Sequence, residues 1–260
     1  MLLIISFSSC NDEKAEKVLQ NTSSSSTAEQ LLLKDIKQHP DSFLLKENLI
    51  QYYRENGNYD NALKEVNDAI QKDTANPRLW QIKAMLHVEN QDTLKAITAF
   101  EKTVNLFPTA SDIISLGTLY AETKNPASLK MADALAVIDN NKAEKEALFI
   151  KGLYYSAINE KEKAISFFDK CLAINYTFMY AYREKCIALY DLGKYKEALA
   201  VITKAITLQN GYEEGYYYEG RCLEKLNRMS DAIESYQTAL MYAPDYIEAK
   251  EALAKLGVKN

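Results

Sequence analysis

The sequence predicts an all-α fold built from helix pairs that recur every 34 residues. Alanine returns at one position of successive repeats, with a single miss at Lys130, and the ladder is Ala28, Ala62, Ala96, Ala164, Ala198 and Ala232. Apolar residues make up 47% of the 260 residues, whereas eight glycines and five prolines are few for the many turns of a β-rich fold. A fixed period outweighs chain length as a guide to architecture, so we expect one repeat array.

The first 27 residues carry two signals of their own. Phe7-Ser8-Ser9-Cys10 follows a short apolar run and resembles the end of a bacterial lipoprotein signal peptide. That resemblance implies a lipid on Cys10 and attachment to the outer membrane of the cell envelope. Residues 1–9 would then be a truncated signal peptide, because no Lys or Arg precedes the apolar run. Residues 10–27 include four consecutive serines and are expected to form a polar tether.

From Ala28 onward each repeat shows two apolar blocks at helical spacing, which predicts two antiparallel helices. Residues 28–42 are expected to form an N-terminal half repeat, residues 43–246 six full repeats, and residues 247–260 a capping helix and tail. Gly57 and Gly193 fall in the turn within a repeat, where a positive φ is often required. Pro108 and Pro244 should end second helices.

Small and large side chains alternate at fixed places in the repeat, counted with Glu213 as position 1. Position 8 is Ile50, Ala84, Thr118, Gly152, Cys186 and Gly220. Position 27 is Ala69, Thr103, Val137, Cys171, Ala205 and Ala239. Position 24 is mainly large, with Val66, Phe100, Phe168, Ile202 and Tyr236. Small residues let helices approach to the near end of the roughly 8 to 10 Å packing range, so each large residue should sit beside a small one.

One repeat, residues 110–144, departs from this pattern. Gly117 and Tyr120 fit positions 8 and 11 only after a shift back by one residue. The Asn125-Pro126 pair predicts a helix start, and we expect an irregular second helix over Ala127 to Ile138. A solenoid absorbs an atypical repeat readily, so we expect a continuous array, with a boundary between two subdomains as the alternative.

These positions resemble the tetratricopeptide repeat, whose consensus has an aromatic residue at position 4, small residues at 8, 20 and 27, Tyr at 11, an aromatic at 24 and Pro at 32. One matching repeat contains Trp80, Ala84, Ala96, Phe100 and Pro108. Another contains Tyr216, Gly220, Ala232, Tyr236, Ala239 and Pro244. The resemblance implies a right-handed solenoid whose first helices line a concave groove for a protein or peptide partner.

In that family the exposed concave positions are 2, 5, 9 and 12 of each first helix. In the last three repeats the resemblance places Phe149, Leu153, Tyr180, Arg183, Ile187, Tyr190, Tyr217 and Arg221 there. The earlier repeats offer Glu47, Gln51, Arg54, Arg78, Gln81, Met85, Ile114 and Thr118. Tyr and Arg dominate binding hot spots, and 14 of the 18 tyrosines lie between Tyr154 and Tyr246, so the C-terminal half is the candidate binding surface. Packing within the repeat is the alternative role for these aromatic residues.

Family members that clamp C-terminal carboxylates use Lys and Asn in the groove, and this sequence lacks that pairing. The residues in those places are Glu47 with Gln51, Gln81 with Met85, and Arg183 with Ile187. Binding of chaperone tails in that manner is therefore not expected.

Catalytic and metal-binding chemistry is not expected from this sequence. His39 and His87 have no carboxylate or cysteine partner at metal-ligand spacing, and His87 at position 11 should pack between helices. Phosphate-binding glycine loops and nucleophile motifs are absent, so no cofactor is predicted. A net charge of -5 without a Lys/Arg cluster argues against nucleic acid. Cys171 and Cys186 fall on adjacent helices, where a disulfide is conceivable beside the default of packed free thiols.

The sequence thus favours a non-enzymatic adaptor, anchored through Cys10 in the bacterial envelope, that holds a partner protein in its groove. The alternative is a cytoplasmic repeat protein, a regulator or co-chaperone-like adaptor, in which the first ten residues have no such role. An enzyme that uses the repeats as a scaffold has no catalytic constellation to support it.

Overall fold

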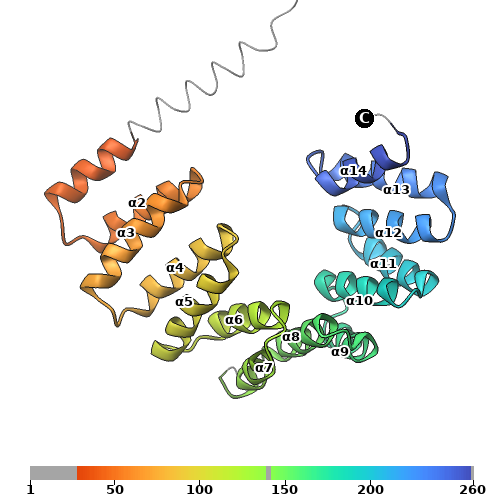
Figure 1. Ribbon diagram of the computed structural model, residues 1–260, viewed down its shortest axis with the longest axis horizontal. Helices are drawn as coiled ribbons and strands as arrows, with labels where there is room; N and C mark the ends of the chain where they lie inside the picture. The colour runs from red at the N-terminus through yellow and green to blue at the C-terminus, as the bar shows by residue number, and fades with distance from the viewer. Residues whose placement is uncertain (1–27, 139–141, 259–260) are drawn as a thin grey trace, which may run out of the picture. The chain divides into compact units, whose positions relative to one another are not determined.

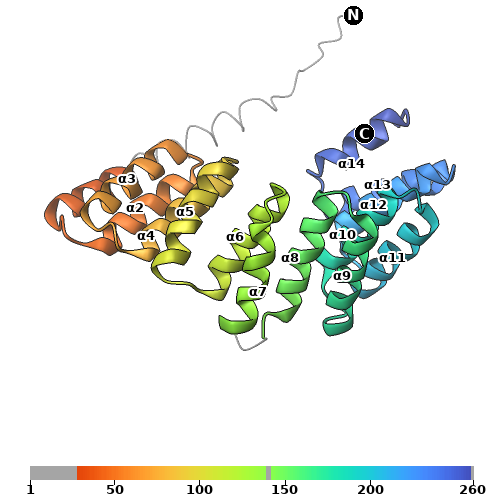
Figure 2. The ribbon, with the colours of Figure 1, turned by 60° about the horizontal axis from the view of Figure 1, so that its bottom comes forward.

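The computed structural model of the chain describes residues 28–138 and 142–258, and within them it consists of helices joined by short turns (Figures 1 and 2). Residues 28–38 form the first helical segment. The helices that follow are α2 (Phe43–Glu55), α3 (Tyr59–Lys72), α4 (Pro77–Glu89), α5 (Thr93–Leu106), α6 (Ala110–Glu122), α7 (Ala127–Ile138), α8 (Glu144–Ala157), α9 (Lys161–Ile174), α10 (Met179–Asp191), α11 (Tyr195–Leu208), α12 (Glu213–Lys225), α13 (Met229–Tyr242) and α14 (Ile247–Lys255). The all-α class is confirmed, and no strand occurs in the described ranges. Cys10 and the serine-rich tether lie outside them.

The chain divides into two compact units, an N-terminal unit that ends at Leu106 and a C-terminal unit that begins at Phe107. Within the N-terminal unit, α2 to α5 pack in sequence order, each against its neighbour along the chain. Within the C-terminal unit, α6 to α14 do the same, and first helices also contact each other directly, α6 with α8 and α10 with α12. The first helices of successive repeats therefore lie side by side and form one face of the unit.

The alanine ladder is the buried seam of each helix pair. Its members Ala62, Ala96, Ala164, Ala198 and Ala232 are all fully inaccessible to solvent. The large residues of position 24 are buried beside them, namely Val66, Phe100, Phe168, Ile202 and Tyr236. A Cβ atom built on Gly152 would lie 2.4 Å from the Phe168 ring, and one on Gly220 would lie 2.6 Å from the Tyr236 ring. Large and small residues therefore interlock as the repeat pattern predicts.

The turn within each repeat places one residue in the left-handed region. Gly57 and Gly193 have φ of 68° and 73°, as expected for the glycines of position 15. Other repeats put a non-glycine residue in the same turn, and these are Gln91, Lys124, Asn159 and Asn227. Glycine is thus the least strained choice at this position, although the turn forms without it.

The irregular repeat confirms some of its predicted features and corrects one. Helix α6 begins at Ala110, one residue early, and both Gly117 and Tyr120 are buried as the shifted register requires. Helix α7 spans the predicted Ala127–Ile138. Val137, however, is 80% exposed, so its prediction as a small buried residue of position 27 is wrong.

The physical reason is a second shift within α7. Ser128, Ala132 and Leu135 are buried with the spacing that Ala62, Val66 and Ala69 have in the first repeat, whereas Lys130 is exposed. Asn125 starts this helix by accepting a hydrogen bond from the Ala127 backbone N–H at 3.0 Å. The seam therefore lies two residues earlier than a strict 34-residue grid would place it.

Candidate functional site

The eight predicted groove residues stand on the first helices of the last three repeats. Phe149 and Leu153 lie on α8, Tyr217 and Arg221 on α12, and the remaining four on α10. Tyr180 is 56% exposed and the other seven are partly buried. The structure brings them together in three groups, which differ in how free they are to meet a partner.

Tyr190, Tyr217 and Arg221 line one hollow of about 370 Å³, which we call the C-terminal groove. The guanidinium carbon of Arg221 lies 4.6 Å from the centre of the Tyr190 ring and 5.9 Å from that of Tyr217. Glu248 and Glu251 of α14 also line the hollow. Aromatic faces, one delocalised cation and carboxylates are thus presented together.

Burial and neighbours set the charges in the C-terminal groove. Burial works against the charged form of Arg221, but the surrounding tyrosines raise its pKa, so it stays cationic. Burial also raises the pKa of Tyr217, with Arg221 opposing, and burial together with Glu184 raises that of Tyr218 to about 12. The groove lining holds three cations, Arg221, Lys225 and Lys255, and three carboxylates, Glu224, Glu248 and Glu251, around the aromatic rings. It therefore suits a partner segment that offers flat apolar groups together with charges of both signs.

Arg183 is engaged inside the protein. Its Nη1 donates to both carboxylate oxygens of Glu214 at 3.0 and 2.9 Å, and its Nε donates to Glu184 at 3.0 Å. Burial opposes its charge, yet the two carboxylates raise the pKa of Arg183. Glu214 belongs to α12, so Arg183 joins the first helices of two repeats rather than offering a free cation.

The third group is aromatic and lies at the α8 end. Phe149 contacts Phe168, Phe178 and Tyr180, with ring centroids 5.8, 5.2 and 6.5 Å apart. Leu153 packs against the same buried cluster. These two residues therefore serve packing first, while Tyr180 presents an exposed edge and Ile187 stays half-buried on α10.

The N-terminal unit has a hollow of its own, of about 430 Å³, between α2 and α4. Its lining includes the predicted concave residues Glu47, Gln51, Arg54, Arg78, Gln81 and Met85. Arg54 donates from Nε to the Glu89 carboxylate at 2.7 Å, and Arg78 pairs with Glu47. Both arginines thus link neighbouring repeats, as Arg183 does in the C-terminal unit.

The cysteines of the described ranges are packed as free thiols, which was the default expectation. Cys186 Sγ lies 3.9 Å from Cys222 Sγ, whereas the Cys171 thiol donates to the Lys145 backbone oxygen at 3.4 Å. All three are free and buried. The candidate bond between Cys171 and Cys186 is therefore wrong, because the two thiols face different partners.

The described residues contain no group of three His, Cys, Asp or Glu side chains arranged to hold a metal ion. Within the same ranges, no helix has the length and hydropathy needed to cross a bilayer.

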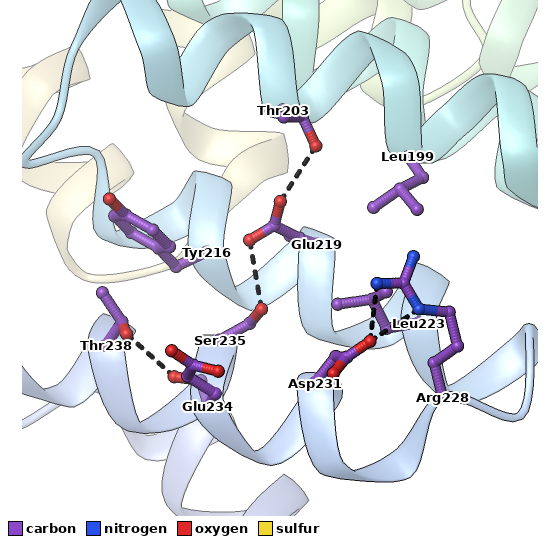
Figure 3. Close-up of a pocket in the computed structure, with 10 residues that line it drawn as sticks. All are labelled: Leu199, Thr203, Tyr216, Glu219, Leu223, Arg228, Asp231, Glu234, Ser235 and Thr238. Atoms are coloured by element: carbon purple, nitrogen blue, oxygen red, sulfur yellow. Dashed lines mark hydrogen bonds and ion pairs between the residues drawn. The ribbon is translucent and has the colours of Figure 1, made fainter.

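Sequence reasoning missed a further hollow of about 480 Å³, which lies between α11, α12 and α13 (Figure 3). In Figure 3 the Glu219 carboxylate lies between two hydroxyl donors, Thr203 at 2.9 Å and Ser235 at 3.1 Å. Arg228 pairs with Asp231 at the other end of the pocket. Glu219, Arg228 and Asp231 therefore each have a polar partner within the pocket. The prediction was limited to groove positions on first helices and so did not include this pocket.

Comparison with known proteins identifies the repeats. Family models described as tetratricopeptide repeat match residues 145–178 and 189–256. A TPR repeat-containing protein of Methanocaldococcus jannaschii is 28% identical over 219 residues, which cover 76% of this chain and 36% of that protein. A DnaJ homolog subfamily C member 7 homolog of Dictyostelium discoideum is 24% identical over 231 residues, which cover 88% of this chain and 39% of that protein. The chain thus spans less than half the length of these curated relatives.

Solved structures agree on the fold. The crystal structure of a tetratricopeptide repeat protein from Parabacteroides merdae superposes with a TM-score of 0.75 at 19% identity, covering 93% of this chain and 95% of that one. The crystal structure of PilW, a type IV pilus biogenesis factor, superposes with a TM-score of 0.63 at 18% identity, covering 80% of this chain and 97% of that one. Residues 145–178 and 189–256 are therefore tetratricopeptide repeats by family match, and the helix pairs on a 34-residue period and the buried alanine seam extend the same fold to the repeats before them.

Proposed function

We propose that the protein is a non-enzymatic adaptor that holds a segment of a partner protein in the C-terminal groove. Solenoid repeats present extended surfaces to partners, and the side chains that vary from repeat to repeat give each array its specificity. The observation that carries the proposal is the cluster of Tyr190, Tyr217 and Arg221 around one hollow. Tyr and Arg are enriched among residues that dominate binding energy, because each combines a large contact area with a polar group.

The test compares two arginines of one repeat. Arg221 lines the groove, whereas Arg228 lies in the turn between α12 and α13 and pairs with Asp231. We expect Arg221→Gln to weaken partner binding at least about tenfold, the loss of one charged contact, and Arg228→Gln to leave it unchanged. Circular dichroism checks that both variants remain folded. Equal affinity of the two variants would remove the groove from consideration.

A crosslinking experiment identifies the partner and its place together. A photoreactive phenylalanine analogue is placed at Tyr190 in the groove, and at Met241 as the control, because Met241 is 69% exposed on α13. The adaptor proposal expects crosslinked partner from position 190 alone. Crosslinks from both positions would indicate non-specific capture.

The proposal also includes a lipid on Cys10 and a place in the bacterial cell envelope, at the outer membrane. Its support is the Phe7–Cys10 signature, which lies outside the described residues. Feeding cells an alkyne-tagged palmitate should label the protein expressed from its native gene, and Cys10→Ser should abolish the label. An unlabelled wild-type protein would contradict the anchor.

The second candidate is a cytoplasmic adaptor of the co-chaperone kind. It is favoured by the likeness to the DnaJ homolog subfamily C member 7 homolog, which extends over 88% of this chain. Cell fractionation separates the two candidates, since this one requires the wild-type protein and Cys10→Ser to fractionate alike with cytoplasmic proteins.

A further inference from the structure

A pocket of about 360 Å³ lies in the N-terminal unit between α3, α4 and α5, on the other side of α4 from the predicted groove positions. We call it the Trp80 pocket. Its polar and aromatic lining consists of Asn67, Trp80, Lys83, His87, Lys95 and Thr98. None of these residues belongs to the concave groove positions, so the pocket is separate from the surface proposed above.

His87 lines this pocket with a ring nitrogen that lacks a hydrogen-bond partner. The residue is 4% exposed, so its predicted burial between helices is found, but its Nδ1 is buried without a hydrogen-bond partner among the described residues. Leaving a buried polar atom unpaired destabilises the folded state, because the atom loses its hydrogen bonds to water without replacing them. Natural structures keep few such atoms, and a bound group is one reason for keeping one.

Two lysines give the pocket positive charge. Lys83 has no ion-pair partner in the described part of the chain, and its ammonium lies 5.2 Å from the centre of the Trp80 ring. Burial lowers the pKa of Lys83, and Lys95 lowers it further. Lys95 is bound to Asp92 at 2.7 Å. Two cations therefore face one carboxylate, although the whole chain carries a net charge of -5.

We propose that the Trp80 pocket binds a small ligand whose oxyanion, a carboxylate or a phosphate, is attached to a flat apolar group. Lys83 binds the oxyanion, His87 hydrogen-bonds to the ligand through Nδ1, and the Trp80 ring covers the apolar part. The indole N–H donates to the Thr74 backbone oxygen at 2.9 Å, which holds the ring in place.

The pocket of Figure 3 provides a comparison within the same molecule. Trp80, Lys83, His87 and Lys95 correspond to Tyr216, Glu219, Leu223 and Asp231, each 136 residues later, which is four periods of 34. At the equivalent place of the last repeat, two acidic residues thus stand where the Trp80 pocket has two lysines. There the carboxylate of Glu219 is satisfied by Thr203 and Ser235, and a leucine replaces the unpaired histidine. The unsatisfied polar groups of the Trp80 pocket are therefore not a requirement of the repeat.

Trp80 is the only tryptophan of the chain, so its fluorescence reports on this pocket alone. The full chain is titrated with phenyl phosphate and, separately, with benzoate, at ionic strength held constant with sodium chloride. We expect a saturable change in fluorescence with at least one of them, and the stronger one identifies the oxyanion. No saturable change with either would overturn the proposal.

Variants test the assignment of residues. Lys83→Gln and His87→Leu should each weaken binding about tenfold, whereas Lys64→Gln, an exposed lysine on α3, should not. His87→Leu copies a residue that another repeat already has at this place, so its folding is expected to be retained, and thermal unfolding checks it. Unchanged affinity in Lys83→Gln would overturn the proposal. Proton NMR gives a second readout, because only His87 of the two histidines should shift on binding.

Discussion

Replacing Gly220 with alanine measures how tightly the two helices of one repeat interlock. The added Cβ would lie 2.6 Å from Cε1 of Tyr236 and 2.8 Å from both Cδ1 and Cζ. Carbon atoms normally approach to about 3.5 to 4.0 Å, so the methyl group overlaps the ring by about 1 Å. Tyr236 is fully buried and its hydroxyl donates to Glu224, so moving the ring aside would disturb that hydrogen bond.

Two effects of opposite sign decide the outcome. Overpacking of a filled core costs about 1 to 3 kcal/mol, while alanine stabilises a helix interior by about 1 kcal/mol relative to glycine. Three ring atoms would lie much closer to the added methyl group than normal carbon–carbon contacts allow. We therefore expect an overpacking cost near the upper end of its range. We expect Gly220→Ala to lower the free energy of unfolding by about 1 to 2 kcal/mol.

Urea unfolding followed by circular dichroism measures this change, with the slope compared as well as the midpoint because repeat arrays can unfold in steps. The control is the same substitution in a Tyr236→Leu background, where the ring is gone and Gly220→Ala should be neutral or stabilising. A Gly220→Ala protein as stable as wild type would refute the packing argument. So would an equal loss of stability in the Tyr236→Leu background.

Three further predictions use other features of the structure. Gln91→Gly should raise the free energy of unfolding by about 1 kcal/mol because Gln91 has φ of 58°, and Gly57→Gln should lower it similarly, both read from urea midpoints. Arg183→Gln should destabilise by about 1 to 3 kcal/mol because Glu214 loses charged hydrogen bonds, and added Glu214→Gln should restore part of this in a double-mutant cycle. Burial raises the pKa of Cys171 from 9.0 to about 12, so the stability that its neutral thiol contributes is complete below pH 9 and is lost as pH rises toward 12. The melting temperature should therefore fall less steeply over this range in Cys171→Ala than in wild type.

The repeat period was sufficient to predict the fold because it reports directly on burial. Each helix pair must bury one row of small residues, and these rows recur at a constant spacing in the sequence. The period therefore remains detectable although one repeat has Lys130 in place of alanine. A local signal predicted the position of α7, since the Asn125-Pro126 pair is typical of a helix start. The prediction from the period failed at Val137, because the grid was kept constant through a repeat whose buried seam lies two residues early, although its second helix begins on the grid.

The candidate site was less predictable, because positions on a helix do not reveal which side chains will pair across repeats. Arg183 and Arg221 look alike in sequence, yet Arg183 is taken up by Glu214 while Arg221 remains in the groove. The partner of Cys186 likewise lies in the next repeat, where Cys222 is near but not at an equivalent position. The signal for the Trp80 pocket was present in the sequence as a histidine in place of tyrosine at position 11, but its meaning required the neighbouring lysines in space.

The inter-repeat ion pairs limit the order in which these repeats can be joined. Glu47 pairs with Arg78, and Arg183 with Glu214, each pair separated by 31 residues and using positions 5 and 2 of adjoining repeats with the charges exchanged. If a gene deletion joined the first repeat directly to the last, Glu47 would meet Glu214. Two carboxylates would then occupy the place of a cation and an anion, and repulsion would replace attraction. The signs of the charges at positions 5 and 2 thus favour the native neighbour of each repeat over another repeat of the same chain. Charge complementarity therefore helps to specify the order of the repeats.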